Sequence, residues 1–216
     1  MLTSVTGVPS LDRLLSPVPS SGWVVEVYGG AARLLAHSAV AEASRRGRVA
    51  VVNVQDFGGF DPYLAARLSR MRGGDPGNIL FARAFRLHDV ASLVLEASST
   101  GAGTVVVVDP FRFAPRTPLA YSLLTRITGA LRAAARRSMV FVANRVTQFG
   151  RARPEGGHFH HHSVHVIARA EWRGRGVFAT LLKHPAKPVP QAALAPEPEL
   201  GVRLLWAGQR PLEEYL

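Results

Sequence analysis

Short runs of β-branched residues recur between residues 23 and 143, and each is followed by an alanine-rich or amphipathic stretch. The runs span residues 23–28, 49–54, 79–83, 104–108 and 139–143. Runs that are apolar at nearly every position are typical of parallel strands, because helices cover both faces of such a sheet. The alternation therefore predicts an α/β fold with a mostly parallel, twisted sheet between two helical layers.

The stretches between these runs predict helices over about 31–46, 61–71, 89–101 and 118–137. Asp61 and Pro62 supply an N-cap and a proline at the first helical position, and Asp89 is expected to cap the following helix.

After residue 144 the pattern changes. We expect strands at 164–171, 177–183 and 202–206 that extend the same sheet with antiparallel members, with residues 173–176 as the turn between the first two. The Pro- and Ala-rich residues 185–200 are expected to cross the surface in an extended conformation.

The 216 residues, 47% hydrophobic and 19% charged, suffice for one sizeable core, so we expect one domain over residues 1–216. No apolar run approaches the roughly 18 residues of a membrane span, and the first residues lack signal-peptide features, which predicts a cytoplasmic protein. The absence of cysteine excludes disulfides, thiolate zinc sites and cysteine nucleophiles. Seven Asn and Gln residues are few and favour a thermophilic source, whereas the scarcity of lysine argues against one.

The net charge of +11 is concentrated in one third of the sequence. Residues 110–183 hold 13 basic and two acidic residues, while the rest of the chain holds 13 of each. A localised excess of this kind predicts a surface that binds polyanions, and the alternative interpretation is a solubilising surface.

A strand, a glycine-containing turn and a helix over residues 23–47 form the arrangement in which α/β proteins hold phosphates. A functional P-loop also needs a lysine and then a Ser or Thr. Here Gly29 and Gly30 are followed by Arg33, and the first 182 residues contain no lysine. Arg33 is the candidate substitute cation, and Asp109 is either the acidic residue that ends the second phosphate-site strand or a turn cap.

An ordered set of short segments extends over nearly the whole chain. The segments are Thr6–Leu15, Glu26–Gly29, Gly59–Pro62, Asn78–Ile79, Val105–Asp109, Asn144–Gln148, Pro154–His158 and Lys183–Pro185. Together they resemble the ATPase core of RecA/RadA-type recombinases and their archaeal RadB-like paralogues. The resemblance implies a RecA-like P-loop ATPase fold without the small helical N-terminal domain of the recombinases.

Departures from the family pattern concern the catalytic parts. Where the family has a glutamate that activates water, this chain has Phe57, with Asp56 beside it. Phosphoryl transfer depends on a cation, a metal ligand and such a base. The resemblance therefore implies a pseudo-ATPase with a degenerate Walker A motif and no catalytic residue, cofactor or metal.

The family's single-stranded DNA loop corresponds to residues 145–162, which implies that this protein binds DNA there. Arg145, Arg151 and Arg153 supply guanidinium groups, and Phe149 and Phe159 are candidates for base stacking. Arg173 and Arg175 add cations on the predicted hairpin. Because the chain begins directly at the core, we expect a monomer or dimer rather than a filament, with a RadA-type recombinase or another repair protein as partner.

Five histidines between His158 and His165 also permit a metal site on an extended strand. Loop packing or contact with nucleic acid is the alternative. We expect His37 and His88 to be ordinary surface or helix-end residues.

The predicted function is thus a non-catalytic accessory of recombination and repair. A divergent ATP-binding protein that uses Arg33 and Asp109 is one alternative, and a protein-binding scaffold without DNA contact is another.

Overall fold

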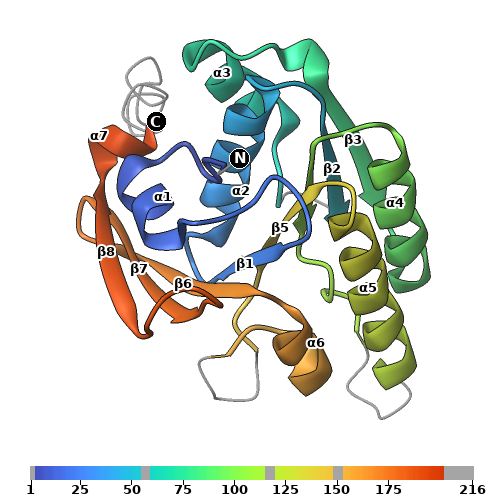
Figure 1. Ribbon diagram of the computed structural model, residues 1–216. Coiled ribbons are helices and arrows are strands. Elements are labelled where there is room, and N and C mark those ends of the chain that lie inside the picture. Colours follow the sequence, from blue (N-terminus) through green and yellow to red (C-terminus); the bar gives the residue numbers. More distant parts are fainter. Residues whose placement is uncertain (1–2, 55–58, 115–119, 148–152, 202–216) are drawn as a thin grey trace, which may run out of the picture.

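The computed structural model describes residues 3–54, 59–114, 120–147 and 153–201. At its centre is an eight-stranded sheet in the order β3-β2-β4-β5-β1-β6-β7-β8 (Figure 1). The strands are β1 Val24–Tyr28, β2 Val49–Val54, β3 Ile79–Ala84, β4 Thr104–Val108, β5 Met139–Asn144, β6 Val166–Arg173, β7 Gly176–Lys183 and β8 Gln191–Pro196. Neighbouring strands from β3 to β6 pair in parallel, whereas β7 pairs antiparallel with both β6 and β8. The predicted α/β class, a mostly parallel sheet with antiparallel strands at its C-terminal side, is confirmed.

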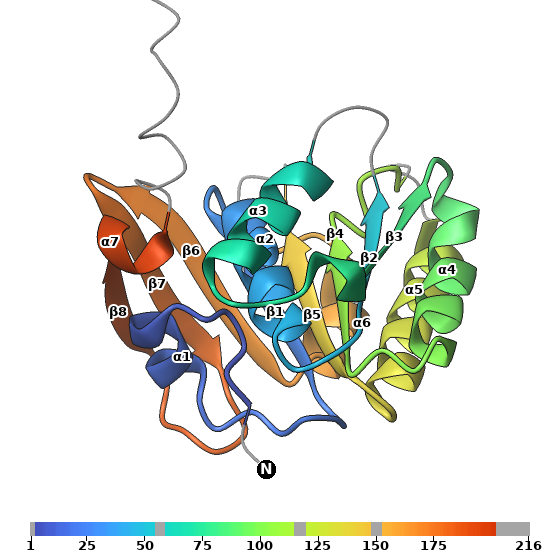
Figure 2. The same cartoon turned by 90° about the horizontal axis from the view of Figure 1, so that it is seen from above.

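Helices lie on both faces of this sheet (Figure 2). In the described part of the chain they are α1 Pro9–Leu15, α2 Ala32–Ser44, α3 Pro62–Met71, α4 Leu87–Ser99, α5 Ala120–Ala135, α6 Gly157–Ser163 and α7 Glu197–Leu200, with a 3-10 turn at Pro76–Asn78. Among these residues, no helix is both long enough and apolar enough to cross a bilayer.

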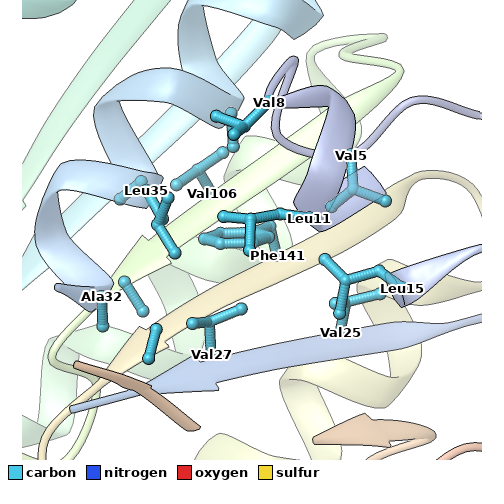
Figure 3. Close-up of a cluster of buried hydrophobic side chains, with 14 of the residues drawn as sticks. Val5, Val8, Leu11, Leu15, Val25, Val27, Ala32, Leu35, Val106 and Phe141 are labelled. Atoms are coloured by element: carbon cyan, nitrogen blue, oxygen red, sulfur yellow. The ribbon is translucent and has the colours of Figure 1, made fainter. Parts of the chain in front are cut away.

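Alternating side chains of the strands build two cores. On β1, Val25 and Val27 face α1 and α2, whereas Val24 and Tyr28 face the side of α4 and α5. Figure 3 shows how Leu35 of α2 lies close to Val27 in the first of these cores. Because both faces are buried, each Val or Leu removed from water contributes about 1.5–3 kcal/mol of transfer free energy.

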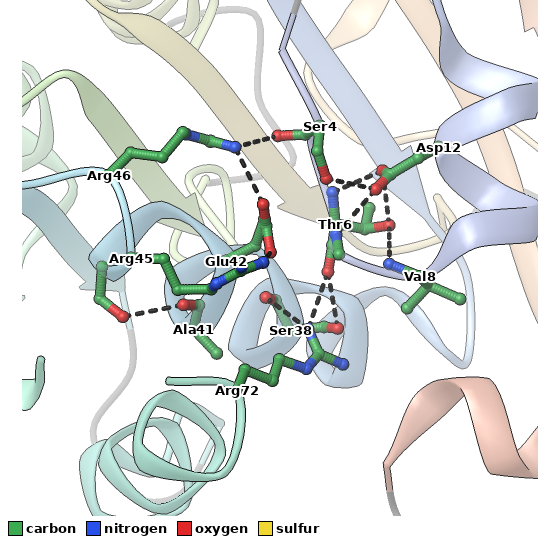
Figure 4. Close-up of polar contacts among 12 residues, drawn as sticks. Ser4, Thr6, Val8, Asp12, Ser38, Ala41, Glu42, Arg45, Arg46 and Arg72 are labelled. Carbon is green, nitrogen blue, oxygen red and sulfur yellow. Dashed lines mark hydrogen bonds and ion pairs between the residues drawn. The ribbon is translucent and has the colours of Figure 1, made fainter. Parts of the chain in front are cut away.

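The Thr6–Leu15 segment is held by its own aspartate. The Asp12 carboxylate accepts hydrogen bonds from the backbone amides of Val5, Thr6 and Gly7 at 2.7–3.1 Å. Arg72 donates to the Thr6 and Ser38 carbonyls, 3.1 Å each, and so ties the segment to α2 and α3 (Figure 4). The motif therefore serves to join the N-terminal segment to the first core.

The helices between the central strands form where the sequence predicts them. The Asp61 side chain accepts from the amides of Tyr63 and Leu64, and Pro62 is the first helical residue, which confirms that N-cap. Asp89 is not a cap, because α4 begins at Leu87 and Asp89 lies in its first turn.

The C-terminal third departs further from the prediction. Residues Gly157–Ser163, which include four of the clustered histidines, form helix α6 rather than an extended strand. The segment 185–200 contains β8 and α7, so it is not a simple surface crossing. The hairpin between β6 and β7 is confirmed, and the predicted strand 202–206 lies outside the described residues.

Parallel strands end at one edge of the sheet, which we call the carboxyl edge (Figure 2). Gly29 follows β1, Asp109 follows β4 and Arg145 follows β5, and β6 ends at the Arg173 hairpin. Ligands of open α/β sheets bind at this edge.

Candidate functional site

The glycine turn after β1 approaches β6 closely. Gly29 has φ +113°, and a Cβ atom at this position would lie 2.5 Å from the Ala170 carbonyl oxygen. The Ala31 amide donates to that oxygen at 3.1 Å. Gly29 is therefore required both by its backbone conformation and by the contact with β6.

The remaining polar groups of this turn are also engaged within the chain. The Gly30 amide donates to Glu171 Oε2 at 3.0 Å, and the Ala32 amide donates to the Gly29 carbonyl at 3.1 Å. Free amides at the start of a helix are the usual ligands of a phosphate. Here a carboxylate of the protein takes one of these amides, and α2 begins directly at Ala32.

Arg33, the candidate substitute cation, forms an ion pair with Asp109. Its Nη2 lies 2.6 Å and its Nε 3.1 Å from Asp109 Oδ2. The Asp109 side chain is 1% exposed and that of Arg33 is 37% exposed. Asp109 also has φ +52°, and its Oδ1 is buried with no hydrogen-bond partner among the described residues.

The segment after β5 returns on itself as a narrow hairpin. The Thr147 amide donates to the Arg153 carbonyl at 2.7 Å, and the Glu155 amide donates to the Arg145 carbonyl at 3.1 Å. We call residues 145–147 and 153–155 the hairpin base. Phe149 and Arg151, both predicted to contact DNA, lie outside the described residues, as do Asp56 and Phe57.

A buried polar network holds this hairpin base to the sheet. Asn144 Nδ2 donates to Glu26 Oε1 at 2.6 Å and to the Glu155 carbonyl at 2.9 Å. His160 Nε2 lies 3.0 Å from the same Glu26 oxygen, and His160 Nδ1 lies 3.1 Å from Thr128 Oγ1. All these side chains are at most 2% exposed. The network therefore fixes both ends of the segment between β5 and α6.

The predicted arginines of this edge are exposed. Arg145 and Arg153 lie on the hairpin base, and Arg173 and Arg175 lie on the β6–β7 hairpin. None of the four forms an ion pair within the described part of the chain. Phe159 on α6 is 54% exposed. Burial raises the pKa of Glu155, and the positive charge of Arg145 opposes this effect.

The basic third of the sequence does not form a single surface. Arg136 and Arg137 follow α5 and precede Met139, the first residue of β5, so they lie at the opposite, amino edge of the sheet. Arg132 donates to the Ser163 carbonyl at 2.9 Å. The charge of this third is therefore divided between the two edges of the sheet, because α5 carries part of it across the molecule.

The histidines of α6 point in different directions. His160 is buried in the network, whereas His158 and His162 are exposed. Within the described ranges, no three His, Asp or Glu side chains lie close enough together to hold a metal ion. His37 is buried rather than on the surface.

Among the comparisons with known proteins, the one with solved structures gives a match. No family model matches the sequence, and no curated protein matches it either. Among solved structures, the fold is similar to the crystal structure of the RadB recombinase, with a TM-score of 0.72 and 22% sequence identity. The match covers 90% of this chain and 94% of that one. At this identity the likeness concerns the fold, and it confirms the predicted RecA-like α/β architecture.

Proposed function

We propose that this protein is a non-catalytic RecA-fold protein that binds single-stranded DNA at the carboxyl edge and acts as an accessory in recombination and repair. The observation that carries the proposal is the contrast at this edge. The groups around the glycine turn bind one another, whereas the four arginines of the two hairpins have no ion-pair partner among the described residues.

Two observations support the absence of ATP hydrolysis. A phosphate loop works through free backbone amides and a free cation, and Mg²⁺ also needs a hydroxyl ligand. Glu171 and Ala170 accept hydrogen bonds from the turn, and Asp109 engages Arg33. No Ser or Thr follows Arg33 before Ser38, whose hydroxyl donates to the Thr6 carbonyl.

Binding to single strands is supported by the residue types at the edge. Arginine forms paired hydrogen bonds with phosphate oxygens, and exposed aromatic rings stack on bases of any sequence. The RadB structure belongs to a recombinase, which agrees with a role on DNA. The partner that this role implies is a RadA-type recombinase, on which the protein would dock as a monomer or dimer.

Charge reversal at the hairpin base tests this function. We expect the double variant Arg145→Glu and Arg153→Glu to weaken binding to labelled oligo-dT more than tenfold, because each lost phosphate contact also loses its counterion release. Fluorescence anisotropy at low salt measures the change. The matched control, Arg136→Glu with Arg137→Glu, changes the net charge equally at the amino edge and should bind within about twofold of the wild type. Equal losses in both variants would show that net charge alone drives binding.

Nucleotide binding is a second candidate function, favoured by the unpartnered Oδ1 of Asp109 among the described residues. A ligand at 100 times its Kd stabilises a protein by about 2.7 kcal/mol. Under our proposal, millimolar ATP with Mg²⁺ leaves the thermal unfolding midpoint unchanged. A shift that disappears in Asp109→Ala would favour nucleotide binding instead.

A further inference from the structure

Strands β6, β7 and β8 have one covered and one exposed face. Val177, Ala179 and Ala195 face the first core, where α1 and α7 contact β8 (Figure 1). On the opposite side Leu194 is 55% exposed. We call this second side the open face; it comprises Arg169, Glu171, Arg173, Phe178, Thr180 and Leu194.

An arginine lies over an aromatic ring on the open face. The Arg173 guanidinium carbon is 4.5 Å from the centre of the Phe178 ring. Phe178 lies opposite Glu171 on β6 and Leu194 on β8, so the ring is central among the three strands. Arg173 forms no ion pair with any described carboxylate, so its guanidinium plane is available to a ligand.

The open face is continuous with the hairpin base. Tyr28 lies in register with Asn144 on one side and with Arg169 on the other. Burial raises the pKa of Tyr28, and the positive charges of Arg169 and Arg153 oppose this effect. A strand bound at the hairpin base therefore has a short route across β6.

Charge on the open face favours a polyanion over an apolar partner. Its acidic side chain, Glu171, is engaged by Arg169 at 3.0 Å and by the Gly30 amide. Arg173 and the neighbouring Arg175 are left as cations without ion pairs among the described residues. Guanidinium planes and aromatic rings are the groups on which unpaired bases stack.

We propose that the open face is a second contact region for single-stranded nucleic acid, in which a base stacks on the Arg173–Phe178 pair. This inference rests on the proposed function and adds a path for the strand, from the hairpin base across β6 to β7.

Oligonucleotides of two lengths test the path. An oligo-dT of about four nucleotides occupies one region, whereas one of about sixteen nucleotides reaches both. For Phe178→Ala we expect about tenfold weaker binding of the long strand and unchanged binding of the short one, as measured by anisotropy. Phe178→Tyr keeps an aromatic ring and should bind as the wild type does. Phe85→Ala is the matched control, because Phe85 is 60% exposed beside β3 at the far end of the sheet.

Arg173→Lys keeps the charge but removes the flat guanidinium, and it leaves the half-buried Phe178 in place. If this folded variant binds the long strand more weakly than the wild type does, stacking on the guanidinium plane contributes to binding in addition to the positive charge. If the wild type binds no oligonucleotide, the proposed function fails along with this inference. If the wild type binds both lengths and all open-face variants match it, the inference alone fails. If Phe178→Ala no longer binds a recombinase partner but still binds DNA as the wild type does, the inference is also wrong, and the open face is instead a contact surface for a protein.

Discussion

At the scale of single residues, Arg33 and Asp109, the two candidate ligand groups of the degenerate phosphate site, form an ion pair with each other. A carboxylate that is 1% exposed needs a cation or several hydrogen-bond donors to remain charged. Arg33 provides both donors that Asp109 has within the described structure, at 2.6 and 3.1 Å, and both contact the same oxygen. The pair therefore has a structural role that competes with any role in binding phosphate.

Removing one partner of this pair should cost more than removing both. We expect Arg33→Ala to lower the free energy of unfolding by about 2–3 kcal/mol, below the range for fully buried pairs because Arg33 is partly exposed. Arg33→Ala combined with Asp109→Asn should recover most of this loss, since no buried charge remains. Urea unfolding measures both, with the exposed Arg136→Ala as the control. A double variant no more stable than Arg33→Ala would contradict the argument.

The missing lysine is readable from the sequence because the first 182 residues contain none, so that no alignment can supply one. The contact of Glu171 with Gly30 is not readable, because it joins positions 141 residues apart. It depends on β6 pairing with β1, a neighbour that the sequence pattern does not identify. Glu26 could have been found, since a glutamate inside an apolar strand run signals a buried polar partner.

At the scale of elements, His37 joins α2 to the start of α3. Its Nδ1 lies 2.7 Å from the Arg33 carbonyl, and its Nε2 accepts from the Asp61 amide at 2.8 Å. The ring also stacks on Phe60 with centroids 4.2 Å apart. These contacts require the neutral imidazole with its proton on Nδ1, because a protonated Nε2 cannot accept a hydrogen bond.

Acid should therefore weaken the junction of α2 and α3. Burial lowers the pKa of His37 below its usual 6.5. The unfolded chain then binds the proton more readily, so the stabilisation is complete above pH 6.5 and is lost as the pH falls towards the folded-state pKa. We expect His37→Gln to flatten this loss when urea unfolding is measured between about pH 5 and 8. As a control, His88→Gln changes an exposed histidine and should keep the wild-type pH profile. If His37→Gln also keeps the wild-type profile, the pH dependence of stability arises from other groups. His165 and His184 are examples, because burial lowers their pKa values too.

Elements with regular apolar spacing were predictable, and those held by single contacts were not. The central strands and helices α2 to α5 follow the apolar periodicity of the sequence. Helix α6 has little apolar spacing; it depends on His160, which packs edge-on against Phe111 with centroids 4.6 Å apart. Half of strand β8 is alanine and it ends at Pro196, so its composition resembles that of a linker. It is a strand because it pairs with β7, a contact that its own sequence does not indicate.

At the scale of the whole molecule, arginines gather at two opposite edges of the sheet. The carboxyl edge holds the four arginines of the two hairpins. At the amino edge, Arg46 and Arg48 line a groove that Met139 also borders, and Arg137 lies just before that residue. A net charge of +11 causes repulsion between like charges within one compact fold, and this repulsion acts within each of these edges.

Salt should therefore change folding stability and DNA affinity in opposite directions. Raising NaCl from about 50 to about 500 mM shortens the Debye length from about 14 to about 4 Å, so repulsion at both edges weakens and the thermal unfolding midpoint should rise. Over the same range the affinity for oligo-dT should fall, with a log–log slope near about −3 if about four phosphates are contacted. Arg136→Glu with Arg137→Glu should reduce the salt dependence of unfolding and leave the DNA slope unchanged. Arg145→Glu with Arg153→Glu should reduce the salt dependence of unfolding and also the log–log slope of DNA affinity. If the two double variants lower the DNA slope equally, the two edges do not act separately.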